Sequence, residues 1–290
     1  MIYSMTGFGA ASHLHLSAQC KVDIRSLNSK STELNLRLPY YLRDHENDLR
    51  QIANTLIVRG KTDINIQLDL HENTKTTFFN AAIVKSIVTE IEQLNQTTSN
   101  PITTTLNLAL SLPEARNSQS IQLDEATIEH VKHTLRLAFD DFNTFRLREG
   151  ATMLIDIQSS LTKIINHKAT IANLEPERAK VQYKKLKSKL ESVDTQLDTN
   201  RLEQEIIYYL EKLDINEELV RLDAHLVFFK QQCVDTNQIQ KGKKMNFIAQ
   251  EIGREVNTIG SKANDARIQH VVVSMKDELE KIKELVNNIL

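Results

Sequence analysis

Residues 61–70 read KTDINIQLDL, and from Ile64 onward every second side chain is apolar. Residues 14–24 (LHLSAQCKVDI) and 33–38 (ELNLRL) alternate in the same way. A period of two places one face of a strand in a core and the other in solvent, which is typical of antiparallel sheets. Between the stretches 33–38 and 61–70, the apolar residues of 42–56 keep helical spacing. The first 70 residues therefore predict a small sheet with a helix.

From about residue 80 the apolar period lengthens to that of a helix. Helices are expected over 83–94, 128–142, 154–171, 181–190, 202–213, 215–229, 244–259 and 265–289. The Thr/Asn-rich stretch 95–105 is expected to be a loop, and Pro176 to interrupt a helix. The predicted fold class is α+β, with an N-terminal antiparallel-sheet domain (1–150), a long helical connector (151–199) and a C-terminal helical domain (200–290).

The composition restricts the class of protein. The 290 residues include 36 Lys+Arg and 38 Asp+Glu, a formal net charge of −2. This balance excludes binding of nucleic acid through overall positive charge, but not through a local basic surface. Cys20 and Cys233 form neither a disulfide framework nor a CxxC metal pair. Because the N-terminus lacks a signal-peptide pattern and no apolar run reaches membrane-spanning length, we expect a cytoplasmic protein with no membrane partner.

Two helical segments depart from the common pattern of one apolar stripe and one solvated face. In the first, Asp214, Glu218, Arg221 and His225 recur at i, i+4, i+7 and i+11 beside the apolar stripe. This spacing places carboxylates, a guanidinium and an imidazole on one face. A surface row of ion pairs explains the same spacing, and the spacing alone does not decide between the two.

The second segment, residues 241–262, begins with three lysines around Gly242. Backbone N–H groups and lysines at a helix start attract phosphate. Gln250, Arg254, Asn257 and Ser261 are expected to share a face. Gly253 and Gly260 each cost about 1 kcal/mol relative to Ala inside a helix, which suggests close approach of a backbone or a ligand. A polar helix whose glycines lie at a helix crossing is the alternative. Neither segment matches a zinc-protease, P-loop, Rossmann or serine-hydrolase motif.

Several ordered blocks resemble the YicC/YloC family of bacterial proteins. The most specific block is QEIGREVNTIGSKA at 250–263. Shorter blocks are MIYSMTGFG at 1–9, RSLN at 25–28, LRLP at 36–39, RGK at 59–61, REG at 148–150, NRLEQE at 200–205 and DINEELVRL at 214–222. The resemblance implies a stress-associated endoribonuclease that depends on a divalent metal and assembles as a homohexamer enclosing RNA. Its matches run from residue 1 to about residue 288.

Roles for individual side chains follow on the matched positions as a hypothesis. RNA cleavage with Mg²⁺ or Mn²⁺ requires carboxylate ligands, a proton-transferring group and cations near the phosphate. The predicted catalytic residues are Glu218, Arg221, His225, Glu251, Arg254 and Glu255, of which Glu218, His225, Glu251 and Glu255 are the predicted metal ligands. The predicted RNA-binding residues are Arg25, Asn28, Lys30, Lys243, Lys244, Asn257 and Lys262. Few aromatic residues are present, so cleavage should depend on RNA shape and strandedness, with structured or single-stranded RNA as the substrate.

The sequence also departs from the family pattern. Ala10 replaces an arginine, Ser29-Lys30 replaces His-Arg, and Asn246 replaces an aspartate. A neutral Asn246 would be a weaker metal ligand than aspartate. Three hypotheses remain: a metal-dependent endoribonuclease within a homo-oligomeric cage, a non-catalytic RNA-binding adaptor for another ribonuclease, and a helical scaffold. A cage with a basic interior would reconcile RNA binding with the net charge, and helices 154–171 and 265–289 are candidate subunit contacts or internal packing.

Overall fold

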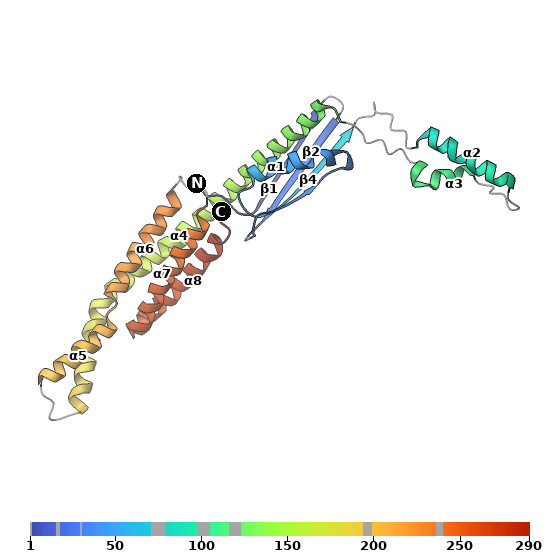
Figure 1. Cartoon of the computed structure of the whole chain (residues 1–290). Helices are drawn as coiled ribbons and strands as arrows, with labels where there is room; N and C mark the ends of the chain where they lie inside the picture. The colour runs from blue at the N-terminus through green and yellow to red at the C-terminus, as the bar shows by residue number, and fades with distance from the viewer. Residues whose placement is uncertain are drawn as a thin grey trace.

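The computed structural model describes residues 2–15, 18–29, 31–70, 79–97, 105–115, 123–193, 199–235 and 240–290. Its elements are β1 (Gly7–His15), β2 (Ala18–Leu27), β3 (Glu33–Arg37), η1 (Tyr40–His45), α1 (Glu46–Leu56), β4 (Lys61–Leu70), α2 (Ala81–Thr97), α3 (Thr105–Ser111), η2 (Pro113–Ala115), α4 (Glu125–Val193), α5 (Thr199–Leu213), α6 (Asn216–Val234), α7 (Gly242–Ala263) and α8 (Ala266–Val286). Figure 1 shows a sheet unit and a helical bundle joined by α4, with α2 and α3 beyond the far end of the sheet. The predicted α+β class is confirmed.

The sheet is mixed rather than purely antiparallel. Its strand order is β1-β2-β4-β3, with β2 antiparallel to both β1 and β4. β3 is parallel to β4. Between these two strands, α1 returns the chain to the end of the sheet where β3 begins, so β4 runs in the same direction as β3. The prediction of an entirely antiparallel sheet was therefore wrong at this strand, since alternation alone does not give strand direction.

Residues 14–24 form parts of two strands rather than one. β1 and β2 pair as a hairpin in which His15 lies opposite Ala18 and His13 opposite Cys20. Opposed residues share a face, so the histidines of β1 lie on the buried face of β2. Leu14 lies on the other face and is exposed. Because the chain reverses between β1 and β2, the side chains that face the core are the odd-numbered ones in β1 and the even-numbered ones in β2. A single continuous strand would instead place Leu14 on the same face as Cys20.

The helices α1 and α4 cover one face of the sheet, and no helix of the described residues covers the other (Figure 1). Val22, Ile24, Ile64 and Ile66 are buried with Phe139 and Phe142 of α4. At Gly9 an added Cβ would lie 2.5 Å from the carbonyl oxygen of Ala138. The backbone of α4 therefore touches β1, and only glycine fits there.

One helix of 69 residues, α4, joins the two units and passes through Pro176 without a break. The prediction that Pro176 interrupts the helix was wrong, because bonds beside the proline hold α4 in place. The buried guanidinium of Arg178 is paired with Glu175 at 2.7 Å and donates to the carbonyls of Ala263 and Leu213, both at 2.8 Å. These bonds tie α4 to the ends of α7 and α5. The division at residues 150 and 199 stays a prediction.

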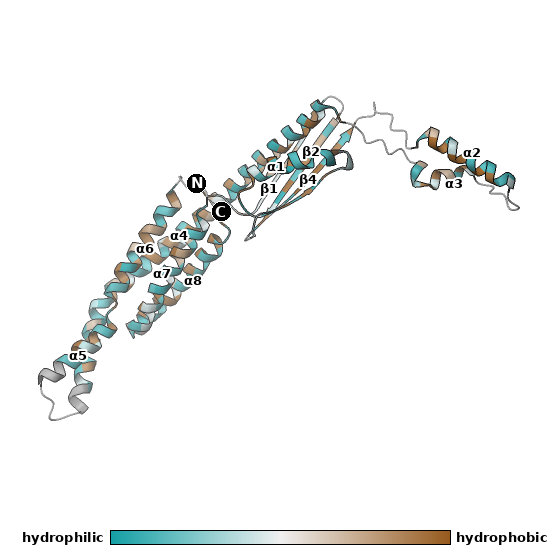
Figure 2. Ribbon diagram, in the orientation of Figure 1, coloured by the Kyte–Doolittle hydropathy of each residue, from teal (hydrophilic) through white to brown (hydrophobic). Residues whose placement is uncertain are grey.

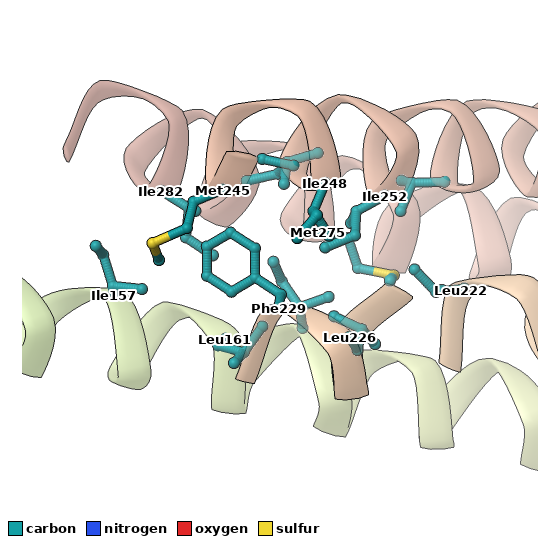
Figure 3. Close-up of a cluster of buried hydrophobic side chains, with 14 of the residues drawn as sticks. Ile157, Leu161, Leu222, Leu226, Phe229, Met245, Ile248, Ile252, Met275 and Ile282 are labelled. Carbon is teal, nitrogen blue, oxygen red and sulfur yellow. The ribbon is translucent and has the colours of Figure 1, made fainter. Parts of the chain in front are cut away.

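The bundle consists of the second half of α4 with α6, α7 and α8, and α5 extends from it (Figure 1). Figure 2 shows hydrophobic residues on the inward sides of these helices and hydrophilic residues outside. Figure 3 shows Phe229 of α6 among Leu161 of α4 and Met245 and Ile248 of α7. The apolar residues of 154–171 at near-heptad spacing, Ile157, Leu161, Ile164 and Ile171, all lie in this core. They therefore pack within the chain.

The two ends of the chain meet where the sheet unit joins the bundle. Ser4 forms a β-bridge with Ile289, and the Leu290 N–H donates to the Tyr3 carbonyl at 3.0 Å. The same end of the chain caps α7, since the backbone N–H groups of Lys241 and Gly242 donate to the Leu290 carbonyl. Ile2 belongs to the core of the bundle. This junction places the start of α7 beside the sheet unit.

Candidate functional site

The two segments with polar stripes, α6 and α7, pack against each other as antiparallel neighbours. Near the start of α6, a carboxylate oxygen of Glu218 accepts a hydrogen bond of 2.7 Å from the Lys262 ammonium near the end of α7. Glu218 is only 4% exposed, and its second oxygen, Oε2, is buried without a hydrogen-bond partner. A buried carboxylate oxygen in this state favours a cation. The Glu218–Lys262 pair also fixes the register of the two helices.

The same register places three other predicted site residues at one level of the α6–α7 interface. His225 lies seven residues beyond Glu218, and Glu255 lies seven residues before Lys262. Glu251 lies one turn before Glu255, toward the N-terminal end of α7. His225, Glu251 and Glu255 are all half-buried. The structure therefore places an imidazole of α6 at the level of two carboxylates of α7.

The four predicted metal ligands do not form a single set. At about 1.5 Å of rise per residue, the eleven residues from Glu251 to Lys262 separate Glu251 from Glu218 by roughly 16 Å. No three described His, Cys, Asp or Glu side chains converge on one point. Mg²⁺, however, is commonly held by one or two carboxylates together with waters and substrate phosphates. Of the predicted ligands, Glu251 and Glu255 lie one turn apart on α7, whereas Glu218 belongs to a separate position.

Other predicted residues face solvent. Arg221 forms an ion pair with Glu217 on the outside of α6. Arg254 is exposed and lies 2.8 Å from an oxygen of Glu251. Gln250, Asn257 and Ser261 share the exposed face of α7 with Arg254, as the spacing predicted. The free cysteines are no nucleophiles at neutral pH, because burial raises the pKa of both thiols to about 11.

The glycines of α7 lie at a helix crossing. An added Cβ at Gly253 would lie 3.2 Å from Leu279 Cδ2, and one at Gly260 would lie 3.1 Å from Val272 Cγ1. Both neighbours belong to α8. Of the two explanations left open by the sequence, close helix packing is therefore the correct one.

A polar cavity of about 590 Å³ lies at the junction of the sheet unit and the bundle. Its lining includes Arg59 from the segment before β4, with Lys243 and Asn246 from the first turns of α7. Asn246 donates to the side-chain oxygen of Asn287 at 3.0 Å. Because Lys243 and Arg59 come from different units, only the tertiary structure brings these two cations to one cavity.

The remaining predicted RNA-binding residues are dispersed. Asn28 donates to the carbonyl of Asn287 at 2.9 Å and so joins the end of β2 to the C-terminus. Arg25 is exposed on the open face of the sheet, with its guanidinium 5.8 Å from the centre of the Phe8 ring. Lys244 lies over the Phe228 ring at 5.0 Å. Lys30 lies outside the described residues.

Sequence reasoning missed two arginines of the junction. Arg59 drew attention only as part of a short block, with no role assigned. Arg146 is buried, and its guanidinium donates to the carbonyls of Ser4, Met5 and Arg59 at 2.7–3.3 Å. Burial lowers the pKa of Arg146 to about 10, so the side chain stays charged at neutral pH. No local pattern in the sequence identifies a partner that lies 142 residues away along the chain.

Fold and site together define an α+β protein in which one long helix joins a sheet unit to a bundle that carries carboxylates, an imidazole and cations. Residues 2–154 match the family model described as endoribonuclease YicC-like, N-terminal region, and residues 171–290 match the corresponding C-terminal model. The chain belongs to the YicC-like endoribonuclease family, which confirms the resemblance.

Curated relatives match over their full lengths. The chain is 29% identical over 295 residues to a protein of Clostridioides difficile named probable endoribonuclease YicC, with 100% of both chains covered. It is 28% identical over 298 residues to the protein of the same name from Haemophilus influenzae, again with 100% of both chains covered. Among the described residues, no helix is long and apolar enough to cross a membrane.

Proposed function

We propose that this chain is a divalent-metal-dependent endoribonuclease that cleaves RNA at the α6–α7 interface. The observation that supports the proposal is the Glu218–Lys262 contact, because its register would bring His225 to about the level of Glu251 and Glu255, in a chain whose full-length relatives are named probable endoribonucleases. Mg²⁺ or Mn²⁺ held there by carboxylate oxygens would neutralise charge that develops on the phosphoryl oxygens. Glu251 and Glu255 are the proposed ligands, completed by a phosphate of the RNA.

Three other side chains of the α6–α7 interface have proposed roles that do not involve the metal ion. The exposed guanidinium of Arg254, which is paired with Glu251 at 2.8 Å, would turn from that carboxylate to a phosphate and hold it through two hydrogen bonds. Lys262 is held by Glu218, and that pair supports the geometry of the helices rather than the phosphate. His225 is half-buried beside this surface and would transfer a proton to the leaving oxygen.

The junction cavity provides a path for the RNA backbone. Arg59 and Lys243 line it from the sheet unit and from the bundle, and both cations attract phosphates without reading bases. Because α7 runs from this cavity to the level of His225, RNA that lies along α7 would contact both places. Cleavage then depends on the shape and strandedness of the RNA, and structured or single-stranded RNA is the expected substrate.

Assembly into a homo-oligomer, proposed as a hexameric cage, requires surfaces other than the near-heptad residues of α4. Val220, Val227 and Val234 lie seven residues apart on α6 and are each at least half exposed. An exposed apolar row at heptad spacing favours helix–helix contact with another chain. This row supports the proposed oligomer, in which the basic junction would face inward.

The test uses a short end-labelled stem-loop RNA with purified full-length protein in EDTA, Mg²⁺ or Mn²⁺. We expect internal cleavage that requires the metal and is lost in Glu251→Gln. Glu280→Gln is the matched control, because Glu280 is an exposed carboxylate of α8, paired with Lys283. Cleavage in EDTA, or equal cleavage by both variants, would contradict the proposal. RNA binding without cleavage in any metal would favour the adaptor function, with Asn246 as the first position to restore to aspartate.

A further inference from the structure

Four histidines gather at the end of the sheet that lies away from the bundle, outside the α6–α7 site. His13 and His15 are two residues apart on β1, so both point from the face that α4 covers. His130 and His133 are three residues apart on α4 and share a face of that helix. The ring centres of His13 and His130 are 5.0 Å apart, those of His15 and His130 are 5.3 Å apart, and those of His13 and His133 are 5.7 Å apart.

Two ring nitrogens in this cluster have the spacing of metal ligands. His13 Nδ1 and His130 Nδ1 lie 3.3 Å apart. Two nitrogens each about 2.0–2.1 Å from a tetrahedral Zn²⁺ are separated by roughly 3.3–3.4 Å. The same separation suits a hydrogen bond between the rings, so it does not decide the matter by itself.

The second nitrogen of His130 favours a ligand role. His130 Nε2 lies 3.1 Å from the backbone carbonyl oxygen of His13, and a carbonyl can only accept, so Nε2 carries the proton. Neutral His130 therefore presents a lone pair at Nδ1. Histidines that bind metal commonly donate their other ring N–H to a carbonyl, which orients the ring. His130 is also only 6% exposed, so its position is fixed by packing.

We propose that His13, His130 and His133, with His15 as a fourth donor, form a site for a transition-metal ion of the Zn²⁺ class. Imidazole donors select such ions, whereas Mg²⁺ and Mn²⁺ prefer oxygen. No three donors among the described residues already converge, so the rings of His133 and His15 turn toward the ion when it binds. The bound ion links β1 to α4 at the end of the sheet opposite the junction.

Two carboxylates near the cluster, Glu129 and Asp124, have other hydrogen-bond partners. Glu129 is engaged by Lys132 at 2.8 Å, and Asp124 accepts from the backbone N–H of Thr127 at 3.0 Å, at the start of α4. Cys20 lies beside His13 on the neighbouring strand β2, on the same face of the sheet, and its thiol forms a hydrogen bond with Thr134. The proposed donors are therefore the four imidazoles, and the Asp124 carboxylate lies close enough to His15 to interact with it electrostatically.

The first experiment measures binding of Zn²⁺ to the full-length protein by equilibrium dialysis and of Co²⁺ by visible absorption. We expect one ion per chain, a Co²⁺ spectrum of tetrahedral nitrogen coordination, and a rise in Tm with Zn²⁺. His13→Asn and His133→Asn should each weaken binding at least about 10-fold. His13 and His133 are exposed, so both variants should retain the fold, which circular dichroism in the absence of metal checks.

Two controls separate this site from others. His270→Asn removes an exposed histidine of α8 and should leave Zn²⁺ binding unchanged. Glu251→Gln, which removes a proposed ligand of the nuclease site, should also leave it unchanged. Absence of saturable Zn²⁺ binding, or equal loss in His270→Asn and His13→Asn, would overturn the proposal.

Discussion

Lys262 of α7 donates to Glu218 of α6 across 2.7 Å, and this pair joins two helix ends that lie 44 residues apart in the sequence. Glu218 is buried, whereas the Lys262 side chain is one-third exposed. The pair is therefore anchored by the carboxylate, with the ammonium reaching inward from the surface. It sets the register of α6 against α7, which puts His225 at about the level of Glu251 and Glu255 along the helix axes.

Removal of Lys262 should destabilise the fold more than removal of both partners. Lys262→Met leaves the buried Glu218 carboxylate unpaired, and we expect a loss of about 2 kcal/mol, less than for a fully buried pair because lysine is partly exposed. The double variant Glu218→Gln/Lys262→Met should recover most of this loss. Urea unfolding of the wild type, Lys262→Met, Glu218→Gln and the double variant gives the double-mutant cycle, and additive effects would show that the two side chains are not coupled.

Gly9→Ala should disrupt the contact of β1 with α4. The added methyl group meets backbone and Cβ atoms of α4 at 2.5–2.6 Å, and overpacking against such rigid neighbours costs roughly 1–3 kcal/mol. Gly253→Ala is the matched control, because its new methyl group meets the flexible end of Leu279 at 3.2 Å. Since alanine favours a helix by up to about 1 kcal/mol over glycine, Gly253→Ala should be neutral or stabilising. Thermal unfolding distinguishes the two, and equal Tm values would contradict the described packing.

Arg178→Met should loosen the ends of α5 and α7 together. The guanidinium satisfies the Leu213 and Ala263 carbonyls while it pairs with Glu175. Loss of this buried cation leaves Glu175 and two carbonyls without their partner, at a cost of about 3–5 kcal/mol. Hydrogen exchange should increase at both helix ends. Arg267→Met, which removes an exposed arginine of α8 paired with Glu177, is the control and should leave exchange at Leu213 unchanged.

Acid should weaken the contact between α4 and α8 through Glu278. The Lys281 ammonium, with Ser160 and Lys163, lowers the pKa of Glu278 from 4.5 to about 2. Because the pKa is lower in the folded state, Glu278 stabilises the fold above pH 4.5, and this contribution is lost as the pH falls from 4.5 to 2. Glu278→Gln should flatten the pH dependence of unfolding in that window. If the free energy of unfolding of Glu278→Gln falls between pH 4.5 and 2 as much as that of the wild type, other carboxylates cause the acid destabilisation.

Neutralising the cations of the junction cavity should weaken RNA binding without sequence preference. Each phosphate contact contributes a slope of about −0.7 to −0.9 to the dependence of log K on log salt. Arg59→Gln and Lys243→Gln should each reduce the magnitude of that slope by up to about 0.7–0.9, the contribution of one phosphate contact. Fluorescence anisotropy over a salt series measures the RNA affinities that give the slope. Lys276→Gln, an exposed lysine of α8 outside the cavity, should not change it. An unchanged slope in Arg59→Gln would place the RNA elsewhere.

Much of the architecture could be read from short-range patterns. The alternation at 33–38 and 61–70 predicts β3 and β4, and the apolar spacing of 265–289 predicts α8, because each element buries one face of its own sequence. The candidate site was predictable as two stripes, at 214–225 and 250–262. Their alignment was not, because spacing along one helix carries no information about the register of its neighbour.

The sequence by itself determined the period of each element, the α+β class and the family to which the chain belongs. Only the tertiary structure decided that β3 runs parallel to β4, that Pro176 lies within a continuous α4, and that Glu218 and Glu251 occupy separate levels. It also brought His13 to His130 and Arg59 to Lys243. The physical reason is that local patterns arise from contacts within a few residues, whereas these relationships depend on packing between segments that lie from about thirty to more than a hundred residues apart.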